Sequence, residues 1–180
     1  SHVEEINGLT KEIADLSEKV QLVELSGAEA NDERDRRDLL IKKLSNLINI
    51  RYAEGDDGAM TITAGNNAVL VSGSSYREIF VAATSEREGK REGNFDIFYK
   101  PTDNSNPVNI TRQLKGGRVG GLLEVRDQVA NDLLNKMDRM AYTLAEEVNK
   151  AHVHGFDRYN ENGGDFFVLP KEIKNSSQYL

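Results

Sequence analysis

The longest amphipathic pattern in the chain lies in residues 121–154, where apolar residues recur with a mean step of about 3.6. The repeat predicts one long helix with a continuous apolar stripe on one face. Gly155 is expected to end this helix, because glycine tolerates the left-handed dihedrals of a helix terminus, and Lys150 suits the negative end of the helix dipole. The stripe consists of Leu122, Val125, Val129, Leu133, Met137, Met140, Leu144, Val148 and Ala151.

A second apolar pattern, in residues 3–25, follows a stricter repeat. Its apolar residues alternate steps of three and four, which is the heptad spacing of a coiled coil. This seam could pair with another copy of the chain, but we expect it to pack against the helix 121–154 of the same chain. The seam consists of Ile6, Leu9, Ile13, Leu16, Val20 and Val23.

A further helix is predicted for residues 31–49. Ser26 and Gly27 interrupt the first helix, and Asn31 is suited to cap the next one because its side chain can accept a backbone hydrogen bond. The alternating charges of residues 32–38 indicate a solvated helix face. The apolar residues expected to be buried are Leu40, Leu44, Leu47 and Ile48.

From Ile50 onward the period changes to two, which is typical of strands. Short runs separated by Gly, Asn, Asp and Ser predict an antiparallel sheet rather than βαβ crossovers. A charged loop is expected over residues 85–93. The predicted strands are 51–54, 60–63, 68–72, 79–83, 95–99 and 108–111.

Together these patterns predict an α+β fold, in which an elongated antiparallel helical bundle or coiled coil carries an inserted small antiparallel β domain. The helical rod would comprise residues 1–50 and 116–169, and the β domain residues 51–115. Residues 170–180 are expected to begin a further region. Because the chain starts at Ser1 without a methionine, we expect it to be an internal fragment.

Composition narrows the possible partners. The formal net charge of −7 argues against nucleic acid, whose phosphates attract a basic surface. The absence of cysteine excludes disulfides and thiolate metal sites. No apolar run approaches the ~20 residues of a membrane span, so membrane insertion is not expected.

Two groups of polar residues could suggest a metal site, and neither fits. His152 and His154 are two residues apart, so on a helix they point to different faces, and a cation at the helix end is the simpler account of them. The segment around Gly163 is similar to part of a calcium-binding loop, but its first and twelfth positions would be Arg158 and Leu169, which are not calcium ligands. We expect no metal.

No catalytic or cofactor-binding arrangement is evident either. The glycine-rich residues 116–121 precede a helix but lack the Gly-Lys-Ser/Thr of a phosphate loop, and we interpret them as a flexible entry from sheet to helix. No serine or histidine stands in a recognisable catalytic context, so an enzyme is not expected. Phe156, Phe166 and Phe167 are predicted to plug one end of the helical bundle.

Several of these segments, in this order, resemble the flagellar hook-associated protein 1 family over most of residues 3–167. The resemblance is carried by the ordered set of motifs rather than by any one of them. The motifs are NDERDRRDLLIKKLSNLINI (31–50), GGLLEVRDQ (120–128), Glu147-Val148-Asn149 with His152, Gly155-Phe156-Asp157, and GGDFF (163–167).

The resemblance implies a structural subunit that joins the flagellar hook to the filament by packing in a ring, outside the cell after export through the flagellar export apparatus. Its partners would be copies of itself, the hook subunit and the next junction protein, without a cofactor. In the family, the helical rod lies inward and the β domain outward, and this fragment alone would be monomeric. The alternative is a coiled-coil adaptor or adhesin-like module whose β domain contacts a ligand.

Overall fold

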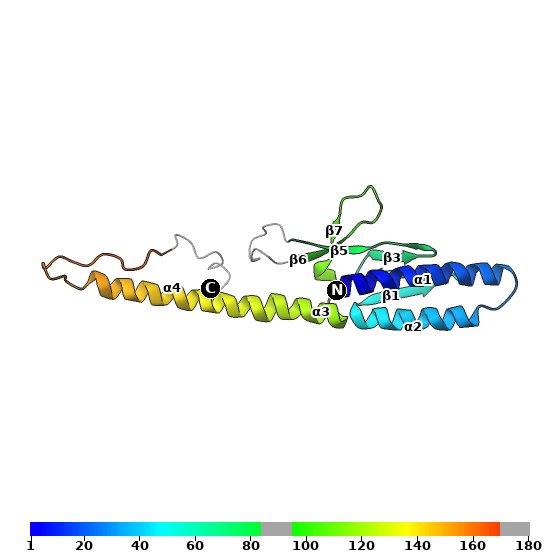
Figure 1. The fold of residues 1–180 in the computed structure, drawn as a ribbon, viewed down its shortest axis with the longest axis horizontal. Coiled ribbons are helices and arrows are strands. Elements are labelled where there is room, and N and C mark those ends of the chain that lie inside the picture. Colours follow the sequence, from blue (N-terminus) through cyan, green and yellow to red (C-terminus); the bar gives the residue numbers. More distant parts are fainter. Residues whose placement is uncertain (84–94, 170–180) are drawn as a thin grey trace. The chain divides into compact units, whose positions relative to one another are not determined.

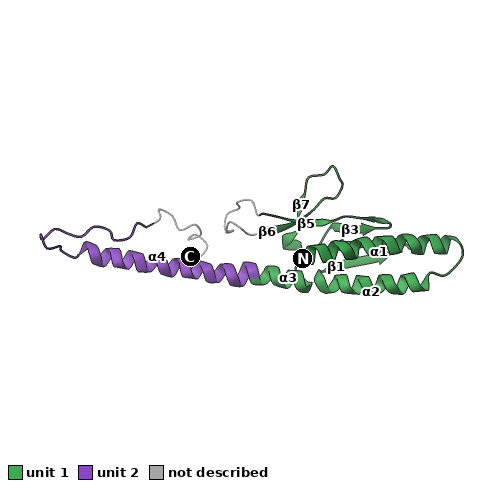
Figure 2. Cartoon of the chain, viewed as in Figure 1, with its two compact units in different colours: residues 1–85, 92–125 green, residues 86–91, 126–180 purple. Residues whose placement is uncertain are grey.

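The computed structural model describes residues 1–83 and 95–169 (Figure 1). Within these ranges the chain forms two compact units (Figure 2): residues 1–83 with 95–125, and residues 126–169. The expected charged loop over 85–93 and the expected further region over 170–180 fall outside the described residues.

The first unit begins with a helical hairpin. Helix α1 (His2–Leu25) is joined to helix α2 (Asn31–Leu47) by a turn that contains Gly27. The φ of Gly27 is 83°, in the left-handed region that favours glycine. The predicted cap is displaced by one residue, because Ala30 occupies the N-cap position and Asn31 is already helical. Asp32 and Glu33 in the first turn of α2 complement the positive end of its dipole.

Two antiparallel sheets follow. The first has the order β1-β2-β3-β4, from β1 (Ile50–Glu54), β2 (Met60–Ala64), β3 (Ala68–Ser72) and β4 (Ser75–Tyr76). The second has the order β5-β6-β7, from β5 (Ile79–Ala83), β6 (Phe95–Tyr99) and β7 (Val108–Asn109), and a short 3₁₀ turn, η1 (Thr111–Gln113), comes next.

The six predicted strands are thus confirmed to within two residues at each end. The two-residue strand β4 was missed because its residues follow the glycine turn at Gly73 and carry no alternating pattern of their own. The last predicted strand is shorter than expected because Thr111 leaves the sheet, and its hydroxyl accepts a hydrogen bond from the Ile97 amide at 2.8 Å.

Helices and sheets of the first unit share a single core. Ile13 of α1, Leu44 of α2 and Leu70 of β3 are fully buried in one apolar cluster, which also includes Ile79 of β5 and Ile110. The predicted separation of a β domain over 51–115 from a helical rod is therefore wrong. The apolar side of each sheet is covered by this unit's helices, so the boundary expected at residue 50 passes through the core.

Four of the six residues of the predicted heptad seam of α1 are buried, with Leu9 and Val23 only half-buried, and their partners differ from those predicted. Ile6, Ile13 and Val20 are fully buried, and α1 packs on α2 and on strands β3, β4 and β5 (Figure 1). The expected pairing of this seam with residues 121–154 is therefore wrong. A coiled coil with another copy is excluded as well, because the same apolar face is already occupied in the core.

A run of helical residues closes the first unit and forms the second. It comprises α3 (Gly117–Glu124), the π-helical segment η2 (Val125–Ala130) and α4 (Asn131–Val153). At Gly117, the first residue of α3, a steric requirement replaces the predicted flexible entry, because its φ is 69° and its Cα lies so close to the backbone of Leu47 that a Cβ would clash. The helix stops at Gly155 as predicted, since α4 ends at Val153 with His154 as the C-cap, but the φ of Gly155 is not positive, so the left-handed conformation expected there is wrong.

An ion-pair network holds the helical hairpin against β1. Arg34 of α2 donates to both carboxylate oxygens of Glu24 on α1, from Nε at 2.7 Å and from Nη2 at 3.0 Å, and to Glu54 of β1 at 2.6 Å. Arg37 is almost fully buried, donates to the Gly58 carbonyl at 3.0 Å and pairs with Glu54 at 2.9 Å. The charged run 32–38 is therefore only partly a solvated face.

The bonds from Arg34 lower the pKa of Glu24 from its ordinary value of 4.5, and the bonds to Glu24 raise the pKa of Arg34. A lowered carboxylate pKa in the folded state means that folding is stabilised by the Glu24–Arg34 pair when the pH is above 4.5. That stabilisation is lost as the pH falls through the lowered value.

The shared core predicts a strong contrast between two positions on α1. Ile13→Asp places a charge without a partner in the cluster and should cost several kcal/mol, comparable to the stability of a small domain, so cooperative unfolding should disappear. Leu22→Asp introduces the same side chain on the same helix at a site that is 62% exposed, and should melt within a few degrees of the wild type. Circular dichroism melts of both variants test this; similar melting temperatures would contradict the shared core.

The Glu24–Arg34 pair predicts a pH-dependent effect of one substitution. Glu24→Gln should lower the melting temperature at neutral pH, and the difference from the wild type should shrink as the pH falls below 4.5, where the wild-type carboxylate also becomes protonated. Glu18→Gln, an exposed change on the same helix, is the control. If the difference in melting temperature between wild type and Glu24→Gln is constant across this pH range, ionisation of Glu24 does not contribute to the pH dependence of stability.

Candidate functional site

The second unit presents an apolar face that nothing in the described residues covers. The residues of this face, which we call the α4 stripe, are between 57% and 73% exposed. A row of apolar residues along one face of an exposed helix is suited to contact with another molecule. The α4 stripe consists of Val129, Leu133, Met137, Met140 and Leu144.

The predicted helix seam over residues 122–148 is therefore not a buried seam in this structure. Val148 is half-buried, and the two members of the predicted set that belong to the first unit, Leu122 and Val125, are exposed. The periodicity correctly identified an apolar face on the helix, but the face has no partner among the described residues.

Polar residues of α4 stabilise the helix in water. Lys136 pairs with Asp132 at 2.7 Å, one helical turn away, and Lys150 pairs with Glu147 at 2.8 Å and Glu146 at 3.4 Å. The hydrogen bonds that Lys150 donates to Glu147 and Glu146 raise the pKa of Lys150. Pairs of this spacing support an exposed helix.

Beyond α4 the chain turns back on the helix, and one asparagine fixes it there. The Oδ1 atom of Asn149 accepts a hydrogen bond from the Phe167 amide at 2.7 Å, and its Nδ2 donates to the Phe167 carbonyl at 2.8 Å. This pair of bonds imitates a backbone ladder, and Asn149 is the one residue of α4 that is classed as buried. A second tie joins Nδ1 of His152 to the Gly164 carbonyl at 2.6 Å.

The intervening turn is organised by Asp157. Its Oδ1 accepts hydrogen bonds from the amides of Tyr159 at 2.8 Å and Glu161 at 2.9 Å, and its own amide donates to the Glu161 carbonyl at 2.9 Å. Gly163 packs so closely on the His152 carbonyl that any side chain at that position would clash. We call residues 155–169 the return segment.

The return segment accounts for the polar residues of this region without a metal ion. His152 bonds to a backbone carbonyl and Asp157 to backbone amides, and His154 caps the helix end without sharing a site with them. Within residues 1–83 and 95–169, histidine and acidic side chains nowhere form a group of three that could hold a metal ion. The pairing of Asn149 with Phe167 was not predicted, because a side chain that binds a backbone eighteen residues later leaves no periodic signal.

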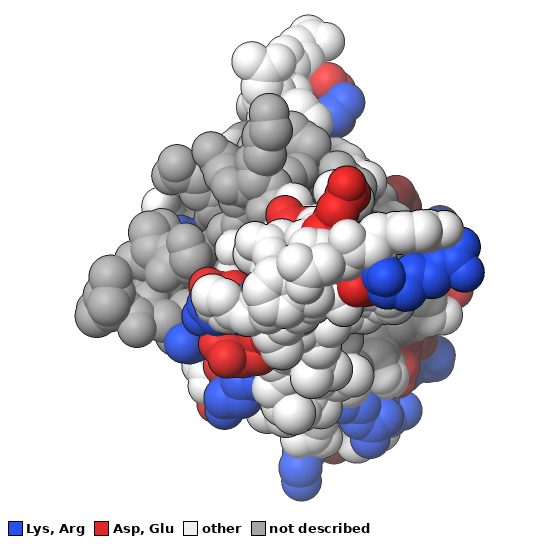
Figure 3. Space-filling view, turned by 90° about the vertical axis from the view of Figure 1, so that its left-hand side faces the viewer, with Lys and Arg blue, Asp and Glu red and all other residues white. Residues whose placement is uncertain are grey.

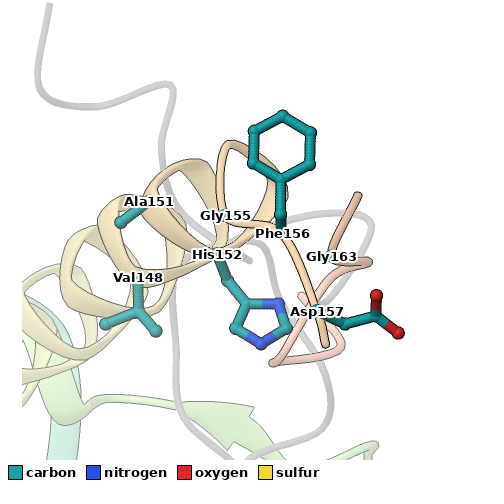
Figure 4. Close-up of a pocket in the computed structure, with 7 residues that line it drawn as sticks. All are labelled: Val148, Ala151, His152, Gly155, Phe156, Asp157 and Gly163. Carbon is teal, nitrogen blue, oxygen red and sulfur yellow. The ribbon is translucent and has the colours of Figure 1, made fainter. Parts of the chain in front are cut away.

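A shallow pocket of about 430 Å³ lies where α4 meets the return segment (Figure 4). Val148, Ala151 and Phe156 give it apolar walls, and His152 and Asp157 line it as well. Seen from the end of the second unit that carries the return segment, the centre of the surface is largely uncharged and charged groups surround it (Figure 3). The apolar walls of the pocket therefore offer a small area for contact at this end of the unit.

The three phenylalanines do not plug a helical bundle. Phe156 and Phe166 are exposed, and Phe167 is 42% exposed although its backbone is held by Asn149. Phe166 and Phe167 pack edge to face with ring centroids 4.9 Å apart, and Phe166 lies 5.6 Å from the ring of His152. They extend the apolar surface at the end of the helix.

These features define the class of protein segment: an α+β unit followed by a long helix that presents an apolar face and a fixed return segment. None of the helices in the described part of the chain combines the length and the apolarity that a membrane span requires.

The family model described as "Flagellar hook-associated protein FlgK helical domain" matches residues 1–167, and the chain belongs to this family. Flagellar hook-associated protein 1 of Escherichia coli is 29% identical over 94% of the chain, and that of Salmonella typhimurium is 29% identical over 98%. The structure of the flagellar hook junction protein FlgK from Burkholderia pseudomallei is similar over 91% of the chain, with a TM-score of 0.76 and 26% identity.

The chain spans about a third of the length of these relatives: 30% of the first, 32% of the second and 29% of the solved chain. The comparisons confirm the resemblance that the ordered motifs indicated, and together with the helices and antiparallel sheets they confirm the α+β class.

The return segment predicts a local effect at Asn149. Asn149→Ala removes both bonds to Phe167, and because the exposed return segment can be hydrated when it detaches, α4 should remain helical while residues 155–169 become loose. Hydrogen–deuterium exchange should show faster exchange of the Gly163 and Phe167 amides. The control, Thr143→Ala, lies on the exposed surface of α4 and should change neither. Unchanged protection of both amides in Asn149→Ala would contradict the anchoring role.

Proposed function

We propose that this chain is part of a structural subunit of the bacterial flagellum that joins the hook to the filament, and that it acts by subunit packing rather than by catalysis. Membership of the hook-associated family supports this proposal. The observation that carries it is the α4 stripe, because an apolar helix face left exposed in the chain is suited to burial in an assembly.

The energetics of the stripe favour contacts that form only in an assembly. Fully burying an aliphatic side chain contributes roughly 1.5–3 kcal/mol, so five residues could contribute substantially. From Val129 to Leu144 the stripe is only about 22 Å long, and at about 10 Å wide it covers on the order of 200 Å², well below the ~800 Å² per partner of a stable interface. The stripe therefore binds strongly only together with other contacts.

Because the area of the stripe is well below that of a stable interface, we expect the isolated chain to be a monomer. Strong association arises when many subunits add further contact surfaces. The proposed partners are copies of the same subunit and its neighbours along the axis, namely the hook subunit and the next junction protein. The proposed location is the flagellum outside the cell, reached through the flagellar export apparatus, and no cofactor is needed for this role.

The coiled-coil adaptor or adhesin alternative loses its main support. It relied on the heptad seam of α1 as a dimerisation surface, and Ile6, Ile13 and Val20 of that seam lie in the core of their own unit. A dimer through this seam would require the first unit to open.

The proposal is tested by Leu144→Asp in the gene that encodes this chain. Leu144 is 66% exposed, so the substitution should leave the melting temperature of the chain within a few degrees of the wild type, but a charge at a buried contact should prevent filament formation and swimming. The neighbouring control Thr143→Asp adds the same charge outside the α4 stripe and should swim normally. Electron microscopy and soft-agar motility provide the readouts, and sedimentation should show a monomer for the isolated chain.

Normal swimming of Leu144→Asp cells would show that the stripe is not an interface. A stable dimer of the isolated chain would contradict the argument from interface size. Loss of swimming in Thr143→Asp as well would assign the effect to the helix rather than to the stripe.

A further inference from the structure

The three methionines of the chain occupy two very different environments. Met60 on β2 is 2% exposed within the core of the first unit. Met137 and Met140 lie one turn apart on α4 and are 57% and 73% exposed. The chain has no cysteine, so these thioethers are its sulfur atoms that an oxidant can reach without unfolding.

We propose that Met137 and Met140 form an oxidation-sensitive site, at which a peroxide converts the thioethers to sulfoxides and thereby weakens association through the α4 stripe. The first part, selective oxidation, follows from exposure alone. The second part rests on the proposed function, because it requires the stripe to be an interface.

The reaction is balanced by the peroxide itself. A lone pair on the methionine sulfur attacks one peroxide oxygen, an S–O bond forms and the O–O bond breaks. The departing hydroxide takes up the proton lost from the transferred oxygen and leaves as water. Sulfur loses two electrons and the peroxide gains them, so no further oxidant or reductant is required.

The position of the two residues makes the modification consequential. They stand at the middle of the α4 stripe, with Val129 and Leu133 on one side and Leu144 on the other. A sulfoxide is polar and accepts hydrogen bonds, so burying it against an apolar partner without a donor is unfavourable. The centre of an interface is also where a polar change is most costly, because water is excluded there.

Assembly would in turn protect the two sulfurs. A stripe covered by a neighbouring subunit leaves little room for a peroxide to reach Met137 or Met140, so oxidation would act mainly on subunits that are not yet assembled. Met137 and Met140 would therefore be oxidised mainly while the subunit is unassembled. Met60 is protected in both the free and the assembled subunit, because it is buried in the core of the first unit.

The first experiment uses the isolated chain, hydrogen peroxide and peptide mass spectrometry. Met137 and Met140 should gain one oxygen at least about tenfold faster than Met60, and the three rates should converge in denaturant, where burial is lost. Equal rates for the three methionines in the folded chain, or resistance of Met137 and Met140, would overturn the proposal.

The second experiment measures assembly in cells that lack the gene and receive it from an inducible promoter. Sublethal hydrogen peroxide during induction should reduce the number of new filaments at least about twofold with the wild-type gene, and much less with M137L/M140L, each compared with its own untreated culture. Leucine keeps the apolar character and cannot be oxidised at these positions. An equal reduction in both strains would overturn the coupling to assembly.

The two proposals can fail separately. Unhindered swimming of Leu144→Asp would refute the interface, while selective oxidation of Met137 and Met140 would still be measured by mass spectrometry. Conversely, a non-swimming Leu144→Asp together with peroxide-insensitive assembly of the wild type would leave the proposed function intact and refute the oxidation-sensitive site.

Discussion

The burial of one face of α1 is the constraint on which the first unit depends. Ile6, Ile13 and Val20 lie on that face at helical spacing, and the faces of α2 and of both sheets converge on them. Because the strands contribute to the same cluster, none of these elements has a separate core. The hydrogen bonds of Asn7 to the Ile79 amide and carbonyl, at 2.9 and 2.8 Å, then join α1 directly to an edge of the second sheet.

Local pattern was sufficient to predict the elements but not their partners. The change of period at Ile50 placed the strands, since alternation is a local property that a sheet with a buried face imposes. Whether those strands formed a domain of their own depended on which surface covered them, and that is a long-range property. Arg37 shows the same limit, because a charged run predicts solvent, whereas Glu54 and Gly58 accept its donors from elsewhere in the chain.

The candidate site likewise has features that the sequence predicted and features that it did not. The apolar periodicity of α4 and the motifs around Asn149, His152 and Gly163 could all be found in the sequence, and the motifs carried the family resemblance before any geometry was known. Their physical roles could not be found there. Asn149 is required for a paired bond to a backbone eighteen residues away, and Gly163 for a close approach to the His152 carbonyl, neither of which has a periodic signature.

The contrast between α1 and α4 shows what an amphipathic pattern does and does not determine. Both helices carry a periodic apolar face, yet Ile13 on α1 is fully buried and Met140 on α4 is 73% exposed. Periodicity establishes that a face can be removed from water; it does not say whether the cover comes from the same chain or from a neighbour. For a family of flagellar subunits, an apolar face left exposed by its own unit is what assembly can use, because the free energy of burial is then released only when neighbours meet. If α4 is the interface that we propose, the exposure that makes it available also leaves its two methionines open to solvent until that contact forms.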